Sequence, residues 1–190
     1  MSSFWDQNTL KLCHRYWAEH LTEGMTVVDA TAGRGRDTEV LCRAVGPTGR
    51  VLAFDIQKDA IESTRQRLTE AGLISRAELF LESHSRMGEH LSRADAVVFN
   101  LGYLPGGDHT VGTKAAETIP ALNAALSLIK PEGFVTVCLY YGGDSGMDEY
   151  NALLQYFSAV DPKEYTVMVQ QFYNRPNCPP VLIIIEPNRA

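Results

Sequence analysis

The chain has 190 residues, of which 45% are hydrophobic and 21% charged, and its formal net charge is −6 at pH 7. This length fits one domain with a proper hydrophobic core, and we expect a single domain over residues 1–190. The negative charge argues against a protein that grips nucleic acid over a broad surface, although it permits contact with one RNA loop through a local basic patch.

The composition also bears on location and on metal binding. No window offers the ~18 apolar residues of a membrane span, and the start lacks the basic and then apolar regions of an export signal, so we expect a cytoplasmic protein. The four cysteines, Cys13, Cys42, Cys138 and Cys178, never fall in a C-x-x-C pair. We therefore expect reduced thiols, with no disulfide framework and no metal site.

Predicted helices and strands alternate through the first half of the chain. Residues 5–21 carry apolar side chains at helical spacing and predict a helix. Residues 26–30 form a short apolar run that stops at a glycine-rich turn, as a buried strand does. The next predicted elements are a helix over 37–45 that ends before Gly46-Pro47, a strand over 50–55, a helix over 58–71 closed by Gly72, and a strand over 77–81.

The alternation continues and then changes near the C-terminus. A short helix around 87–91 and a strand over 94–99 precede a long helix over 113–129 that stops at Lys130-Pro131. A strand over 133–140 and a helix over 148–159 follow. Residues 165–172 and 181–186 leave no room for a helix between them and predict an antiparallel hairpin. The expected fold is a doubly wound, mostly parallel seven-stranded α/β sheet with a C-terminal antiparallel hairpin.

The strongest local signal is the run 29–35 (DATAGRG), which leaves the first predicted strand. Gly33 and Gly35 allow a tight turn and a close approach of a ligand to the backbone. A dinucleotide fingerprint needs a third small residue where Thr38 stands. Asp29 would repel a pyrophosphate but suits a cation such as S-adenosylmethionine. The D-x-x-x-G-x-G spacing is the glycine-loop signature of class I methyltransferases; the alternative is an ordinary turn with chance glycines.

Polar residues also end the second and third predicted strands. Asp55 lies about 20 residues after Gly33, where an acid meets ribose hydroxyls; alternatively, it caps the helix that begins near Gln57. Ser83 and His84 follow the third strand, beside the expected adenine ring, and either could bond the amino group of the base. A capping serine and an exposed histidine are the alternative interpretation.

The fourth predicted strand ends where class I enzymes place the transferable methyl group. Asn100, followed by Tyr103, is similar to the N-P-P-Y loop of amino-group methyltransferases, in which oxygens orient the target nitrogen and an aromatic ring stacks on the substrate. Asp108 and His109 are candidate acceptors for the substrate proton. An ordinary Gly/Pro-rich connection with polar surface residues is the alternative.

The chain resembles a family of bacterial proteins labelled putative rRNA methylases. The matching stretches are 28–38, 100–106 (NLGYLPG), Asn177 with Pro179-Pro180, and the LCH of 12–14, and the resemblance covers nearly the whole chain. It implies S-adenosylmethionine as cofactor and methylation of 5-aminomethyluridine, often 2-thiolated, at the tRNA wobble position. The pattern departs from the family at Arg34, where an asparagine is common, and at 141–143, where Pro-Gly-His is usual.

These arguments together predict a site for transfer of a methyl group to an RNA amine by direct displacement, without a metal. The predicted catalytic residues are Asn100, Tyr103 and Asp108. The predicted cofactor-binding residues are Asp29, Thr31, Gly33, Gly35, Asp37, Thr38, Asp55, Gln57, Ser83, His84 and Asn100. The predicted partner is RNA, namely the tRNA anticodon loop, whose unstacked bases are accessible. Candidate phosphate contacts are Arg34, Arg36, Lys114 and Arg175.

Three alternative functions stay open at this point. The chain could methylate rRNA or a small molecule, since all the cofactor arguments apply equally to such an enzyme. A nicotinamide-dependent oxidoreductase is disfavoured by Asp29 and Thr38. A non-catalytic RNA-binding or scaffold protein could retain the fold. The sequence leaves both a monomer and a homodimer open.

Overall fold

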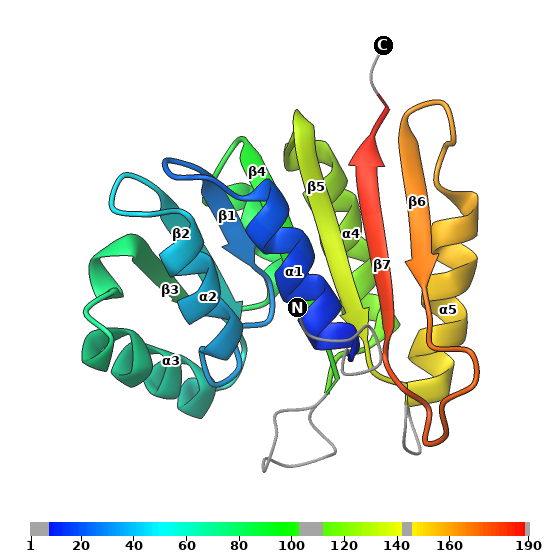
Figure 1. Ribbon diagram of the computed structural model, residues 1–190, viewed down its shortest axis with the longest axis horizontal. Coiled ribbons are helices and arrows are strands. Elements are labelled where there is room, and N and C mark those ends of the chain that lie inside the picture. The colour runs from blue at the N-terminus through cyan, green and yellow to red at the C-terminus, as the bar shows by residue number, and fades with distance from the viewer. Residues whose placement is uncertain (1–7, 103–111, 142–145, 189–190) are drawn as a thin grey trace.

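The computed structural model describes residues 8–102, 112–141 and 146–188. They form a seven-stranded sheet with the strand order β3-β2-β1-β4-β5-β7-β6 (Figure 1). The strands are β1 (Thr26–Asp29), β2 (Arg50–Asp55), β3 (Ala77–Leu81), β4 (Ala94–Leu101), β5 (Ile129–Leu139), β6 (Tyr165–Gln170) and β7 (Val181–Pro187). The helices are α1 (Thr9–His20), α2 (Arg36–Ala44), α3 (Lys58–Glu70), α4 (Ala115–Leu128), α5 (Gly146–Ala159) and the 3₁₀ helices η2 (Ile74–Arg76) and η3 (His84–Glu89).

Helices cover both faces of the sheet (Figure 1). Helices α1 and α2 pack on one face, where their apolar residues form a cluster with alternate residues of β1, β4 and β7. Helices α4 and α5 cover the opposite face and bury the other set of strand residues. This division follows from strand geometry, because successive side chains of a strand point to opposite faces.

The strand directions confirm the predicted fold class. Strands β1 to β5 pair in parallel, whereas β7 lies antiparallel between β5 and β6. Strand β6 therefore runs in the same direction as β5, and its last residue lies at the edge where the parallel strands end. We call this edge the carboxyl edge; in open α/β sheets it is the place where ligands bind.

Two predicted elements differ from the observed ones. The short helix expected over 87–91 is instead the 3₁₀ helix η3, which begins at His84. Strand β5 begins at Ile129, not at residue 133, so Lys130-Pro131 lies inside a strand. The pairing of β4 with β5 shifts register between Ala94 and Ala96. A proline is tolerated in a strand at such an irregularity, since no ladder hydrogen bond needs its missing N–H.

The remaining predicted bounds lie within two residues of the described helix and strand ends, and those of β2 and β3 match. The start predicted for the first helix, at residue 5, lies outside the described residues. Within them, the Asn8 side chain accepts a hydrogen bond from the Lys11 N–H and caps α1. Strand β6 ends at Gln170, two residues before the predicted end.

No described helix has the length and apolar character needed to cross a membrane.

A buried hydrogen bond fixes the position of α1 on the sheet. The Trp17 Nε1–H donates to the Thr136 hydroxyl of β5 over 2.9 Å, and the tryptophan is 2% exposed. An indole N–H that is buried needs such a partner. The bond holds the C-terminal half of α1 over the middle of β5, and Thr9 at the start of α1 bonds the Pro180 carbonyl at the carboxyl edge.

Candidate active site

Asp29 lies beneath the glycine loop, not at its surface. Its carboxylate accepts hydrogen bonds from the Thr31 N–H over 3.1 Å and from the Thr38 hydroxyl over 2.7 Å. Asp29 is 1% exposed and Thr38 is 0% exposed. Burial raises the pKa of Asp29 to about 7. These two bonds tie β1 to the first turn of α2, and the predicted contact of Asp29 and Thr38 with the cofactor stays a prediction.

The glycine at position 35 is required mainly by helix packing. Gly35 has a φ of +73° and precedes α2, and a Cβ atom there would lie 2.8 Å from the Thr64 Cα of α3. The Thr64 hydroxyl also donates to the Gly33 carbonyl over 3.1 Å. Helix α3 thus occupies the space beside Gly35 in which the sequence predicted a ligand. Of the two glycines, Gly33 is the one that stays a candidate for contact with a ligand.

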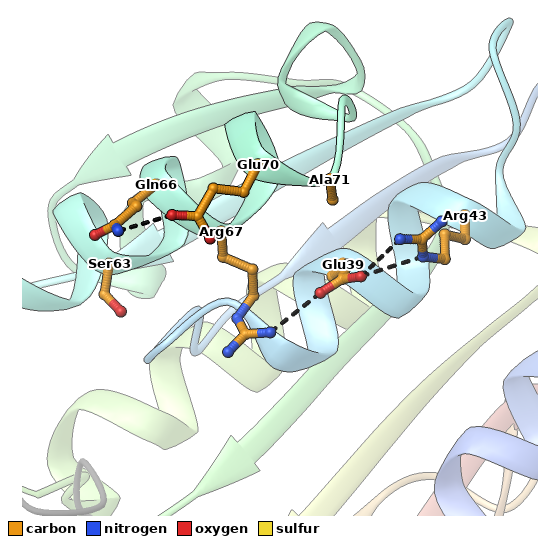
Figure 2. A pocket seen from close by; sticks show the side chains of 7 residues that line it. All are labelled: Glu39, Arg43, Ser63, Gln66, Arg67, Glu70 and Ala71. Carbon is orange, nitrogen blue, oxygen red and sulfur yellow. Dashed lines mark hydrogen bonds and ion pairs between the residues drawn. The ribbon is translucent and has the colours of Figure 1, made fainter.

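A chain of ion pairs between α2 and α3 supports the glycine loop. The Arg67 Nε–H of α3 donates to the Arg34 carbonyl over 2.9 Å. The Glu39 carboxylate pairs with both Arg67 and Arg43, and these residues border a polar hollow of about 490 Å³ between α2 and α3 (Figure 2). None of the predicted cofactor-binding residues lines this hollow, so it supports the loop but is not the predicted site.

Asp55 bridges the glycine loop and the start of α3. One oxygen accepts from the Gly33 N–H over 2.9 Å, and the other accepts from the Gln57 N–H over 2.9 Å. Gln57 is the N-cap residue of α3, and the helix has no side-chain cap, so Asp55 fixes the turn before α3 and does not cap the helix itself. Burial raises the pKa of the Asp55 carboxyl. Each carboxylate oxygen can accept a second bond, so Asp55 retains capacity for a ligand hydroxyl.

The centre of the candidate site is a chain of hydrogen bonds through Asp37, at the start of α2. One Asp37 oxygen lies 2.7 Å from His14 Nε2 of α1. The other lies 2.9 Å from Asn100 Nδ2 at the end of β4. The Asn100 N–H donates to the Thr31 hydroxyl over 2.7 Å. Helix α1, the glycine loop, α2 and β4 thus meet at the carboxyl edge. Hydrogen bonds fix both the backbone and the side chain of Asn100.

His14 is a site residue for which sequence reasoning predicted no role. It lies on α1, 23 residues before Asp37, and its ring packs against Trp17 with a centroid distance of 4.9 Å. Its side chain is 31% exposed. The match of the LCH segment at 12–14 to the family was the available signal, but only the fold brings His14 to Asp37.

Ser83 and His84 have separate roles. The Ser83 hydroxyl accepts a hydrogen bond from the Ser85 N–H, which confirms the alternative of a capping serine. The half-buried His84 ring places Nδ1 2.9 Å from the Ala30 carbonyl, so the alternative of an exposed histidine is wrong. His84 Nε2 is buried and has no hydrogen-bond partner in the part of the chain that is described. Burial lowers the pKa of His84, which favours the neutral ring.

Tyr140, which follows β5, is a second residue that sequence reasoning missed. Its N–H donates to the Leu101 carbonyl over 3.1 Å, and the side chain is 41% exposed. Burial raises the pKa of the Tyr140 phenol, and the neighbouring Cys138 and Asp37 raise this pKa further. The Tyr140 ring thus lies next to Gly102, two residues after Asn100, since a Cβ atom on Gly102 would lie 3.8 Å from the Tyr140 Cγ. The predicted site residues Tyr103, Asp108 and His109 lie outside the described residues.

The predicted phosphate contacts are spread along the carboxyl edge. Arg34, Arg36 and Lys114 are exposed at the loops around α2 and α4, and the Arg175 guanidinium lies 3.7 Å from the centre of the Phe172 ring. Among residues 8–102, 112–141 and 146–188, no three histidine, cysteine or acidic side chains gather as metal ligands would.

Comparisons with known proteins identify a matching family and a similar named relative. The family described as "Putative rRNA methylase" matches residues 51–186. A protein of Arabidopsis thaliana named "tRNA (mnm(5)s(2)U34)-methyltransferase, chloroplastic" is 35% identical over 194 aligned residues, which cover 96% of this chain and 71% of the relative.

Two solved structures are similar over almost their whole length. A structure described as a putative rRNA-methylase from Clostridium thermocellum has a TM-score of 0.94 and 44% identity, and the match covers 96% of this chain and 98% of that one. A structure described as a putative methyltransferase from Streptococcus mutans, in complex with SAH, has a TM-score of 0.87 and 31% identity, with 96% and 99% covered.

The packing of Gly35 against α3 predicts a large effect of Gly35→Ala. The added Cβ meets the α3 backbone, whereas Gly72 has a similar φ of +68° and no atom within 4 Å of its added Cβ. Gly72→Ala should cost about 1 kcal/mol of unfolding free energy from backbone strain alone. Gly35→Ala should cost at least twice that in urea denaturation. Equal losses for the two variants would contradict the packing argument.

The buried Asp29 predicts a pH-dependent stability. Its folded-state pKa is raised from an ordinary value of 3.8 to about 7, so the folded protein holds this proton more tightly than the unfolded chain does. The Asp29 contribution to stability should therefore fall as pH rises from 4 to 7. Relative to the wild type, Asp29→Asn should become more stable by a few kcal/mol between pH 5 and pH 8. Urea titrations without cofactor measure this difference, and a difference independent of pH would refute it.

Proposed function

We propose a substrate for this chain, which belongs to the family described as "Putative rRNA methylase" and is an S-adenosylmethionine-dependent methyltransferase. The proposed acceptor is the exocyclic amine of 5-aminomethyluridine, or of its 2-thio form, at the tRNA wobble position. The name of the Arabidopsis relative, which specifies U34 of tRNA, supports this choice. The cytoplasmic location expected from the sequence stays a prediction.

The orientation of the Asn100 carboxamide is the observation that carries the proposal. A carboxylate only accepts hydrogen bonds, so the group that faces Asp37 over 2.9 Å must be the Asn100 NH₂. The carbonyl oxygen of Asn100 therefore points away from Asp37, and no residue in the described part of the chain donates to it, so we propose that it accepts from the substrate. An amine that donates one hydrogen to this oxygen has its nitrogen lone pair directed by the bond, and such orientation accelerates a displacement.

The residues around the glycine loop fit S-adenosylmethionine. This cofactor supplies a methyl group activated by a sulfonium cation. The remaining acceptor capacity of Asp55 suits the two ribose hydroxyls. The Ala30 carbonyl can only accept, so Nδ1 of His84 carries the hydrogen and the orphaned Nε2 is an acceptor. An adenine amino group is a donor that would satisfy this nitrogen once the side chains that cover it move on binding.

Proton removal is the second requirement of the reaction. An alkyl ammonium must lose a proton before its nitrogen can attack. Asp37 and His14 connect the Asn100 side chain to the protein surface, because the His14 side chain is 31% exposed. We infer that this pair holds Asn100 in place, and that the ammonium passes its proton to solvent water before the neutral amine attacks the methyl group. We infer that the acceptor base packs against the Tyr140 ring.

The family result removes two of the alternative functions. A nicotinamide-dependent oxidoreductase and a non-catalytic scaffold both disagree with membership in a methyltransferase family. Methylation of rRNA shares the cofactor site described above, and the choice between rRNA and tRNA depends on the substrate assay below.

The two hydrogen bonds of Asp55 predict its role in cofactor binding. Asp55→Ala should lower the affinity for S-adenosylmethionine by ~10-fold or more, because it removes a charge-assisted acceptor and releases the Gly33 N–H. Isothermal titration calorimetry measures the affinity directly. Asp95→Ala is a suitable control, since Asp95 bonds Thr26 and Lys130 at the opposite end of the strands. Equal affinities for wild type and Asp55→Ala would remove Asp55 from the site.

Asn100→Ala should lower turnover far more than it lowers cofactor affinity. Loss of one orienting group costs on the order of 100-fold in kcat. The assay is transfer of labelled methyl to tRNA bearing 5-aminomethyluridine, with Asn123→Ala as the control, because Asn123 of α4 bonds Tyr156 away from the site. The rate should also rise as pH increases toward the pKa of the amine.

The same methyl-transfer assay distinguishes the proposed tRNA substrate from rRNA and from free nucleosides. Transfer to the modified tRNA should exceed transfer to rRNA fragments and to free nucleosides. Robust transfer to rRNA with none to this tRNA would reject the wobble-uridine proposal and leave the methyltransferase assignment intact.

A further inference from the structure

The loop between β6 and β7, residues 171–180, lies at the same carboxyl edge as Asn100. Strand β6 runs in the direction of β5, so its last residue and the loop that follows lie where the parallel strands end (Figure 1). Three strand spacings separate β6 from β4, which is about 14 Å. A substrate seated at Asn100 reaches this loop only if it extends beyond one nucleotide. We call residues 171–180 the hairpin loop.

The composition of the hairpin loop differs from that of the chain. Its sequence, QFYNRPNCPP, has two aromatic residues, three side-chain amides and one arginine, and it contains no acidic residue. The whole chain, in contrast, has a net charge of −6. The loop is therefore a cationic, aromatic surface on an acidic protein, which is the composition that single-stranded nucleic acid prefers.

Contacts at both ends of the hairpin loop fix its position. The Gln171 Nε2–H donates to the Tyr141 hydroxyl over 3.3 Å, and the Tyr141 ring packs on Tyr150 with a centroid distance of 4.4 Å. At the other end, the Thr9 hydroxyl of α1 donates to the Pro180 carbonyl. An anchored loop loses little conformational freedom on binding, so its exposed groups can contribute fully to affinity.

Tyr173 is the exposed group that this anchored loop presents. It is 98% exposed, the highest value among the large apolar side chains that lie at the surface of the described residues. One residue before it, the Phe172 ring stacks with the Arg175 guanidinium, whose Cζ lies 3.7 Å from the ring centre. That stack holds the positive charge of the loop over the ring of Phe172, the residue that precedes Tyr173.

We propose that the hairpin loop binds the single-stranded RNA beside the target nucleotide, with one nucleobase stacked on Tyr173. The charge of Arg175 lies where the phosphodiester of that nucleotide would pass. This inference rests on the proposed function, because it assumes an RNA acceptor at Asn100. Stacking on an aromatic ring is tolerant of base identity, so Tyr173 contributes affinity for the strand and Asn100 selects the amine.

The test is the kinetics of Tyr173→Ala with an anticodon stem-loop RNA that bears 5-aminomethyluridine. The KM for this RNA should rise about 5-fold or more, since stacking on one aromatic residue contributes at least that factor. The kcat and the affinity for S-adenosylmethionine should not change. Tyr173→Phe keeps the ring and should restore the wild-type KM. Met168→Ala is the control, because Met168 is 47% exposed in the middle of β6.

Several outcomes would overturn the proposal. The KM of Tyr173→Ala would equal that of the wild type, or Tyr173→Phe would be as impaired as Tyr173→Ala. A change from dimer to monomer on gel filtration, with an unchanged KM, would show that Tyr173 contacts a second copy of the chain.

A separate binding measurement distinguishes this failure from failure of the proposed function. Fluorescence anisotropy with the unmodified stem-loop RNA requires no methyl transfer. If the wild type binds this RNA and Tyr173→Ala binds it 5-fold more weakly without any methylation of the modified RNA, the loop proposal holds and the wobble-amine proposal fails. If the wild type methylates the modified RNA and Tyr173→Ala binds the unmodified RNA equally well, only the loop proposal fails.

Discussion

The Asp37 carboxylate is the contact on which the candidate site depends. Its two oxygens join His14 of α1 to Asn100 at the end of β4, which are 23 and 63 residues away from it along the chain. Because a carboxylate only accepts, this one side chain dictates which way the Asn100 amide faces. The geometry proposed for amine attack therefore depends on correct docking of α1, which the buried bond between Trp17 and Thr136 secures.

A second carboxylate stabilises the frame around this contact. Asp29 is buried under the glycine loop and bonds Thr31 and Thr38, while the Thr31 hydroxyl accepts from the backbone of Asn100. The loop is therefore linked both to the centre of the site and to the buried end of β1. The groups left with spare bonding capacity, the Asp55 oxygens and His84 Nε2, lie around this rigid frame. Such a preorganised arrangement is what binding and orientation of a substrate require.

The sequence was sufficient for the fold and for which polar residues stand at the strand ends. Apolar runs and turn residues predicted all seven strands, and Asp29, Asp55 and Asn100 were correctly expected at strand ends. Local patterns could not predict that the Asp29 side chain bonds Thr38, because Thr38 reaches Asp29 only when α2 packs against β1. They also missed His14 and Tyr140, which reach Asn100 only through tertiary packing. The start of β5 was wrong because Lys130-Pro131 indicates a helix end, and nothing local indicates the register shift that accommodates the proline.

We propose that this methyltransferase modifies the wobble amine of tRNA, with Asn100 orienting the acceptor. Mass spectrometry of tRNA nucleosides from the source organism, with the gene deleted and then restored, tests this proposal directly. We expect 5-aminomethyluridine or its 2-thio form to accumulate on deletion, and the wild-type gene, but not an Asn100→Ala gene, to restore the methylated nucleoside. An unchanged level of the methylated nucleoside in the deletion strain would contradict it.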